Sequence, residues 1–239
     1  MKHLLLIAAF AIGYTNVQAQ DMNAVLMKTM AAFDSTQDPA KRTEYANKVE
    51  LIAKKWKDEW APHYYNAYAK AILTYSMPQE TMEKRDAILD EAEAELDEAV
   101  TLMGKKEAEE NSEVFVLKAV MAQARMIIDG RNRWQTYGKL FEDNLRAAKE
   151  KDESNPRIYY LKGTSVYFTP KAFGGGPKKA LEYFEKAKPL FAQETKGDMK
   201  DPFWGSQAND FFIQQCNNPE QTDDAGTSKG ADGSSPSAE

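Results

Sequence analysis

A six-residue pattern occurs twice in this chain. Val114–Ala119 follow the order apolar, aromatic, bulky, leucine, lysine, small, and Ile158–Gly163 repeat that order 44 positions later. Phe203–Ala208 match the order more weakly, and Tyr64–Tyr65 stand at the corresponding place one repeat earlier. Repeats of this length indicate one supersecondary unit copied along the chain, and such units bury a continuous core only when they stack.

A second pattern follows three of these copies and has the spacing of one helix face. Its members are Ala92, Leu96 and Ala99, then Phe141, Leu145 and Ala148, then Ala180, Phe184 and Ala187. Small residues at such positions let two antiparallel helices approach closely, while a bulky neighbour fills the groove beside them. Apolar residues elsewhere also recur with helical periodicity, and no segment shows the alternation typical of a strand. We therefore predict an all-α fold.

Proline and glycine mark the predicted ends of the helices. Asn155, Gly176 and Asp201 each precede a proline, which is the order expected where a capping residue is followed by the first helical position. Gly104 and Gly130 stand where helices should stop. Together these signals predict about nine helices with short connections.

The two patterns resemble the tetratricopeptide repeat (TPR) family over Trp60–Cys216. Gly163 fits the small position in the first helix of a repeat, and Ala180, Phe184 and Ala187 fit the motif of the second helix. The resemblance implies antiparallel helix-hairpin repeats stacked as a TPR-like α-solenoid. These copies are degenerate and longer than the family's repeat of about 34 residues. A plain helical bundle is the alternative.

The two ends of the chain differ in composition from the repeats. Lys2, the apolar run Leu4–Ile12 and the small residues up to Ala19 form a secretory signal pattern, and the run is too short to span a bilayer. We predict cleavage after Ala19, with an uncleaved membrane anchor as the alternative. Residues 20–58 then form an N-terminal helical pair, residues 59–216 the repeats with a C-terminal capping helix, and residues 217–239 a disordered tail. The protein is expected to be exported, periplasmic or secreted, without membrane insertion after cleavage.

Charge and the scarcity of reactive residues limit the functions to expect. The net charge of −6 argues against a nucleic-acid partner, because phosphate contacts need clustered Lys and Arg. His63 is the one histidine left after signal removal, and Cys216 is the one cysteine. We predict a solvent-facing His63, a buried Cys216 and a solvated helix face for the acidic run Asp90–Glu98. No catalytic residue, metal site or cofactor is predicted.

The TPR resemblance also implies a concave groove lined by the first helix of each repeat. Counted from the small positions, the candidate groove residues are Tyr65, Glu113, Gln123, Arg157, Tyr160, Thr164, Tyr167 and Asn209. This aromatic and polar set suits an extended peptide or a small polar ligand, unless the tyrosines instead fill the core. The loop residues Phe173, Gly174, Gly175 and Gly176 are a second candidate contact, or an ordinary connection between two helices.

We therefore predict a non-catalytic, exported TPR-like scaffold that binds a protein or peptide in its groove. The alternative is a small-molecule binding accessory of a periplasmic transport system, which uses the glycine-rich loop and the tyrosines. An enzyme of unfamiliar type is the third hypothesis. A deep closed pocket at the axis of the array would favour the small-molecule alternative over an open peptide groove.

Overall fold

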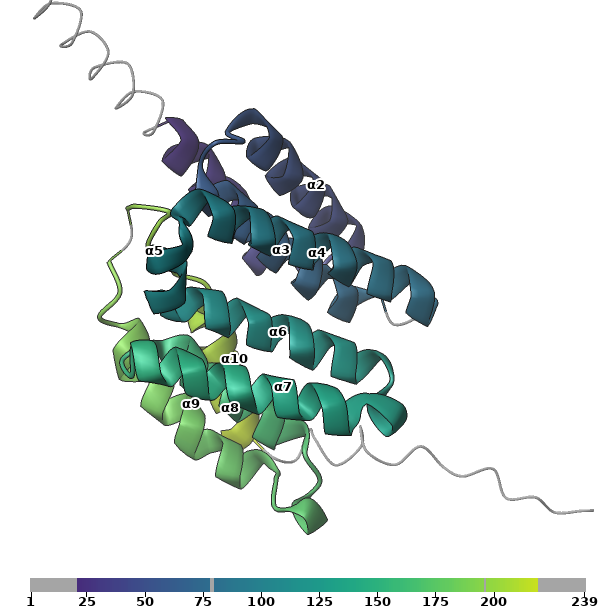
Figure 1. The fold of residues 1–239 in the computed structure, drawn as a ribbon. Coiled ribbons are helices and arrows are strands. Elements are labelled where there is room, and N and C mark those ends of the chain that lie inside the picture. Colours follow the sequence, from purple (N-terminus) through teal and green to yellow (C-terminus); the bar gives the residue numbers. More distant parts are fainter. Residues whose placement is uncertain (1–20, 78–79, 196, 219–239) are drawn as a thin grey trace, which may run out of the picture.

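The computed structural model describes residues 21–77, 80–195 and 197–218 (Figure 1). All regular secondary structure in these ranges is helical, which confirms the all-α prediction. The predicted signal peptide, residues 1–19, and nearly all of the predicted disordered tail lie outside the described residues. Among the helices that are described, none has the length and apolar character needed to cross a membrane.

The helices follow one another with short connections. A helix over residues 21–35 precedes α2 (Pro39–Lys55) and α3 (Trp60–Leu73). The remaining elements are the 3₁₀ turn η1 (Thr74–Ser76), α4 (Met82–Met103), α5 (Lys105–Glu110), α6 (Ser112–Ile128), α7 (Gly130–Lys151), α8 (Pro156–Phe168), the 3₁₀ turn η2 (Lys171–Phe173), α9 (Pro177–Phe191) and α10 (Ser206–Asn217).

Two of the three predicted proline starts are correct, and one is wrong. The side chain of Asn155 accepts a hydrogen bond from the backbone N–H of Arg157 at the start of α8, and α9 begins directly after Gly176. Asp201 starts no helix, because α10 begins only at Ser206. The chain between α9 and α10 instead runs into the core, where it buries Met199.

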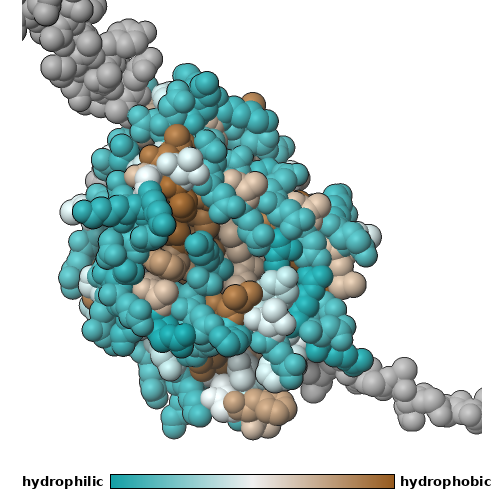
Figure 2. All heavy atoms as spheres, viewed as in Figure 1, coloured by the Kyte–Doolittle hydropathy of each residue, from teal (hydrophilic) through white to brown (hydrophobic). Residues whose placement is uncertain are grey.

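Consecutive helices pair into three hairpins, α3 with α4, α6 with α7, and α8 with α9, which succeed one another through the molecule (Figure 1). The pairing of α8 with α9 depends on Gly163, because a Cβ atom there would lie 2.5 Å from the ring of Phe184. Helix α2 packs on α3, and α10 packs on α9. The surface seen in Figure 2 is mainly hydrophilic, with few apolar side chains between the polar ones.

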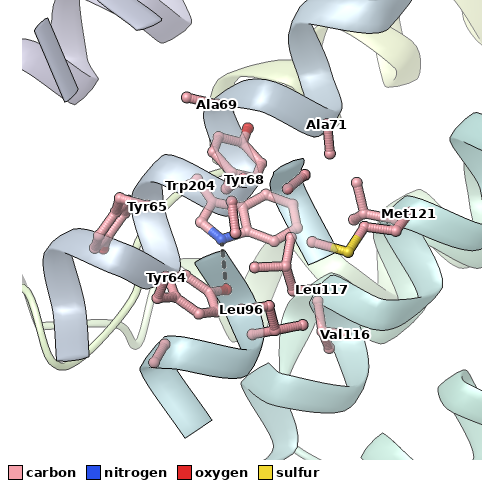
Figure 3. Packing of buried hydrophobic residues seen from close by; sticks show 14 of the residues in the cluster. Tyr64, Tyr65, Tyr68, Ala69, Ala71, Leu96, Val116, Leu117, Met121 and Trp204 are labelled. Atoms are coloured by element: carbon pink, nitrogen blue, oxygen red, sulfur yellow. Dashed lines mark hydrogen bonds between the residues drawn. The ribbon is translucent and has the colours of Figure 1, made fainter. Parts of the chain in front are cut away.

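Trp204 joins elements that are far apart in the sequence. The largest apolar cluster extends from the helix over residues 21–35 to α8, and it also contains Trp204 from the segment before α10. The indole Nε1–H of Trp204 donates a hydrogen bond of 3.0 Å to the hydroxyl of Tyr64 on α3, drawn as a dashed line in Figure 3. The C-terminal segment is therefore part of the central core and is not confined to the end of the array.

Candidate functional site: an apolar cavity across the hairpins

A cavity of about 970 Å³ lies between the first helices of the hairpins and α10. Side chains from α3, α6 and α8 line it, together with Phe211 and Phe212 of α10. Further lining residues come from α2, η1 and α7, and from the segment around Trp204. The volume lies at the upper end of the range of about 300–1,000 Å³ that is typical of small-molecule pockets.

Aromatic rings make up much of the cavity wall. The ring of Tyr68 stacks on Trp204, with centroids 4.5 Å apart and an interplanar angle of 30° (Figure 3). Tyr160 and Phe212 form a second aromatic pair, with centroids 6.4 Å apart. Three more lining side chains are well exposed, namely Trp134, Phe168 and Phe211. Exposed aromatic rings around a cavity indicate a ligand that buries apolar area when it binds.

The uncharged polar groups of the wall bond mainly to one another. Gln123 Nε2 donates to Thr164 Oγ1 at 3.2 Å, and the Thr164 hydroxyl donates to the carbonyl of Leu161 at 2.8 Å. The Tyr75 hydroxyl makes two long contacts, of 3.4 Å to the Val120 carbonyl and 3.5 Å to Gln123 Oε1. Burial raises the pKa of Tyr75, so its phenol stays protonated at neutral pH.

Arg42 is the charged side chain among the residues that line this cavity in the described part of the chain. Its guanidinium donates to Ser76 Oγ at 2.8 Å and to the carbonyl of Thr36 at 2.6 Å. Nearby, Asp34 accepts a hydrogen bond of 3.4 Å from the Tyr68 hydroxyl. Burial raises the pKa of Asp34 to about 7, although the Tyr68 hydrogen bond and the charge of Arg42 act in the opposite direction.

A second cavity, of about 680 Å³, is polar and lies near the start of α6 and α8. Its central side chain is Arg157, which is 1% exposed. The Nε of Arg157 lies 3.2 Å from Glu113 Oε1, and its other nitrogens contact Glu194 and the carbonyl of Pro202. Because the Arg157 guanidinium is already bound by these protein groups, we interpret this cavity as a structural network and not as the candidate ligand site.

The structure distributes the predicted groove residues over three environments. Gln123, Tyr160 and Thr164 line the apolar cavity, whereas Glu113 and Arg157 belong to the polar network. The remaining three lie in neither cavity: Tyr65 packs near Phe203, Asn209 Nδ2 donates to the Phe184 carbonyl at 3.0 Å, and Tyr167 packs on Phe212. Tyr65 and Asn209 are each 1% exposed, so both are core residues and do not line a groove.

The glycines between α8 and α9 have a structural explanation. The backbone N–H of Gly176 donates to the Val166 carbonyl at 2.9 Å, and Gly174 and Gly176 have φ angles of 86° and 102°. A Cβ atom on Gly175 would lie 2.2 Å from the Thr169 carbonyl oxygen. Phe173 is 81% exposed and does not line the cavity. The loop therefore needs glycine to fold back on the end of α8.

The prediction of a solvent-facing His63 is wrong. His63 is 9% exposed, with Nδ1 2.7 Å from Glu95 Oε2 and Nε2 3.2 Å from the Lys57 carbonyl. The hydrogen bond to Glu95 raises the pKa of His63. Glu95 belongs to the acidic run Asp90–Glu98. This run also contacts a cation of a neighbouring helix, because a carboxylate oxygen of Glu91 lies 2.6 Å from Lys70 Nζ.

The sequence predicted a buried Cys216, whereas the side chain is only partly buried.

Several cavity residues were not among the candidates from the sequence: Arg42, Tyr68, Tyr75, Trp134, Trp204, Phe211 and Phe212. Tyr68 and Tyr75 belong to an apolar stripe that runs along α3 into η1, but α3 is buried on nearly all sides, so the stripe does not separate cavity residues from core residues. Trp204 lies in a connection without periodicity, and no local signal places it beside Tyr68. Within the described residues, no cluster of three or more His, Cys, Asp or Glu side chains could hold a metal ion.

The whole fold has a counterpart of known structure. The HusA haemophore from Porphyromonas gingivalis superposes with a TM-score of 0.66 and is 33% identical in sequence, and the match covers 83% of this chain and 94% of that one. The chain belongs to the HusA family. Because the match with HusA extends over nearly all of its length, the relationship concerns the complete arrangement of hairpins and not one helical pair. No protein-family model and no curated protein sequence matches the chain.

Proposed function

We propose that this protein binds haem in the apolar cavity between the hairpins and α10. The observation that carries the proposal is an aromatic-walled cavity of about 970 Å³ in a chain of the HusA family, whose structurally known member is a haemophore. Haem is a flat macrocycle, and the aromatic side chains Tyr68, Trp204 and Phe212 that line the cavity offer it planar apolar contacts.

Burial of the macrocycle would supply most of the binding free energy. Removing apolar surface from water contributes about 25 cal/mol per Å², and the exposed rings of Trp134, Phe168 and Phe211 would lose water contact together with the ligand. The described residues of the cavity wall include no histidine. His63 lies elsewhere in the fold, where its Nδ1 contacts Glu95. Tyr68, Tyr75, Tyr160 and Met126 are the wall residues of the types that ligate haem iron in other proteins. Burial raises the pKa of all three phenols, which makes each a weak ligand.

The cavity favours a compact ligand over the peptide of our first prediction. An extended peptide needs partners for its backbone N–H and C=O groups. Here Gln123 and Thr164 are already bonded to each other, and most other wall side chains are apolar. This supports the small-molecule binding part of the alternative prediction, an accessory of a periplasmic transport system.

The same proposal includes the architecture and the location. We propose that the three hairpins are degenerate TPR-like repeats whose first helices, α3, α6 and α8, face an axis that α10 closes. Export as a periplasmic or secreted protein is supported by the signal pattern that ends at Ala19 and by the haemophore relative. A protein that captures haem outside the cell has to be exported, so the proposed location agrees with the proposed function.

Haem titration of the purified mature chain tests the proposal. Binding should shift the haem Soret band and quench tryptophan fluorescence, because Trp134 and Trp204 line the cavity. Phe211→Ala should weaken binding about tenfold, since burying a phenylalanine contributes about 1.5–3 kcal/mol. Phe173→Ala is the matched control, because Phe173 is also exposed but lies outside the wall. Absence of saturable binding, or equal loss in both variants, would refute the site.

A further inference from the structure

We infer that Arg42 binds a carboxylate of the ligand, so that the cavity selects a tetrapyrrole acid over its neutral ester. This inference rests on the proposed haem site and adds to it the polar group that orients the ligand. It assigns Arg42 a role in ligand selection that the repeat patterns do not suggest, because Arg42 comes from α2 and lies outside the repeats.

The position of Arg42 singles it out. It lines a cavity whose other wall residues in the described chain are uncharged. Its two hydrogen bonds, to Ser76 Oγ and to the Thr36 carbonyl, fix the guanidinium at this wall. A guanidinium carries five N–H donors, so donors remain for a ligand beside these two bonds.

Arg42 also lacks a counter-ion among the described residues. Its Nε is buried without a hydrogen-bond partner, and no carboxylate of the described chain lies within 4 Å of the guanidinium. Arg125, Arg133 and Arg157 differ in this respect, because each has a carboxylate oxygen at 3.2 Å or closer. Arg85 is also buried with an unpartnered Nε, but it does not line the cavity. A cation held at an apolar wall without such a partner gains most from a ligand anion.

Asp34 does not fill this role. It interacts with the charge of Arg42, but its hydrogen bond is to the Tyr68 hydroxyl. Burial raises the pKa of Asp34 to about 7, so a large share of the molecules carry a neutral Asp34 at neutral pH. The positive charge at the cavity wall is therefore only partly compensated within the protein.

The chemistry of the ligand completes the case. The two acid side chains of haem are carboxylates at neutral pH, and an unpaired carboxylate in an apolar cavity would lose its hydration without compensation. Arginine offers planar paired donors that match a carboxylate, and such charge-assisted hydrogen bonds are stronger than neutral ones. The acid edge of the macrocycle is thus expected at the α2 side of the cavity.

The test compares haem with haem dimethyl ester, in one buffer with the same detergent, for the wild-type chain and for Arg42→Met, Arg42→Lys and Arg146→Met. Arg146 is the matched control, because it is an exposed arginine of α7 that does not line the cavity. Circular dichroism verifies that each variant is folded. Tryptophan quenching gives the dissociation constants for both ligands.

The dissociation constant of the wild type for the ester should be at least about tenfold higher than for haem, as expected for loss of a charge-assisted hydrogen bond. Arg42→Met should remove this preference, Arg42→Lys should keep part of it, and Arg146→Met should behave as the wild type. Equal affinity of the wild type for both ligands would overturn the role of Arg42 while leaving the haem site intact. Failure of the wild type to bind either ligand would instead overturn the proposed function. Because the wild-type comparison needs no substitution, the inference stays testable even if Arg42→Met does not fold.

Discussion

Tyr68 and Trp204 form a stacked pair in which a residue of α3 meets a residue of the segment before α10, with ring centroids 4.5 Å apart. Both residues are buried in the core, at 5% and 3% exposed, and both also line the apolar cavity. The same contact therefore contributes to stability and to the wall of the proposed ligand site. Substitutions at this pair should change both properties.

Trp204→Phe should destabilise the fold less than Trp204→Ala. Phenylalanine keeps an aromatic ring against Tyr68 but loses the hydrogen bond to the Tyr64 hydroxyl, at a cost of about 0.5–1.5 kcal/mol in addition to lost volume. Alanine leaves a large void and should cost about 3–5 kcal/mol. Urea unfolding measures both values. Equal destabilisation by the two substitutions would show that the ring contact contributes little.

Arg157→Met should be among the most destabilising single changes in the described chain. Arg157 is 1% exposed and pairs with Glu113 and Glu194, so its removal takes a buried cation away from both carboxylates. Breaking one side of a buried ion pair costs about 3–5 kcal/mol. Arg146→Met, which removes an exposed partner of Asp143, should change stability by about 0.5 kcal/mol or less. A similar midpoint for both variants in urea would contradict this view of the network.

Asp34→Asn should stabilise the protein at pH 8 and have little effect at pH 4. The pKa of Asp34 rises from an ordinary 3.8 to about 7 on folding, so the folded chain binds a proton more tightly than the unfolded chain. The contribution of Asp34 to stability therefore falls as the pH rises from about 4 to about 7, by about 1.4 kcal/mol per unit of pKa difference. Asparagine is uncharged and can still accept the Tyr68 hydrogen bond.

Melting temperatures of wild type and Asp34→Asn over this pH range measure the effect. The two curves should lie close together near pH 4 and separate as the pH rises. A gap that is constant with pH would mean that Asp34 titrates normally in the folded protein.

Gly163→Ala should destabilise the contact between α8 and α9. The added Cβ atom would lie 2.5–2.9 Å from three ring atoms of Phe184, whose ring also stacks on Phe212 with centroids 5.1 Å apart. Overpacking costs about 1–3 kcal/mol, against a helix-propensity gain of up to about 1 kcal/mol for alanine. Phe184→Leu should relieve the clash, so a double-mutant cycle should give a coupling of about 0.5–3 kcal/mol. Strict additivity in the cycle would show that the two positions do not meet.

Helical periodicity predicted the class of fold, and the groove positions that the TPR resemblance implies include part of the cavity wall. Counting along the first helices identified Gln123, Tyr160 and Thr164, because α6 and α8 each present one face to the cavity. The same counting failed in α3, which is buried on nearly all sides, so its pattern does not show that Tyr65 faces the core and Tyr68 the cavity. Such counting depends on a contrast between a polar and an apolar face, and a helix that is buried on nearly all sides does not show this contrast.

The other missing residues depend on contacts between distant segments. Trp204 meets Tyr64 across 140 residues of sequence, from a connection that has no periodicity. Arg42 belongs to the N-terminal helices, which the repeat patterns do not include. Local patterns carry no information on such pairings, because the pairings follow from how the helices pack in three dimensions.

The wall of the cavity combines residues from both ends of the described chain. Arg42 comes early in the sequence, and Phe211 and Phe212 come close to its end. A ligand in the cavity would link α2 to α10 through non-covalent contacts. Since a ligand that binds only the folded form shifts the unfolding equilibrium, the proposed haem ligand should raise the melting temperature of the folded chain and slow hydrogen exchange in α2 and α10 together. A chain that ends before α10 should lose this link, so the ligand should no longer raise its melting temperature or slow its hydrogen exchange.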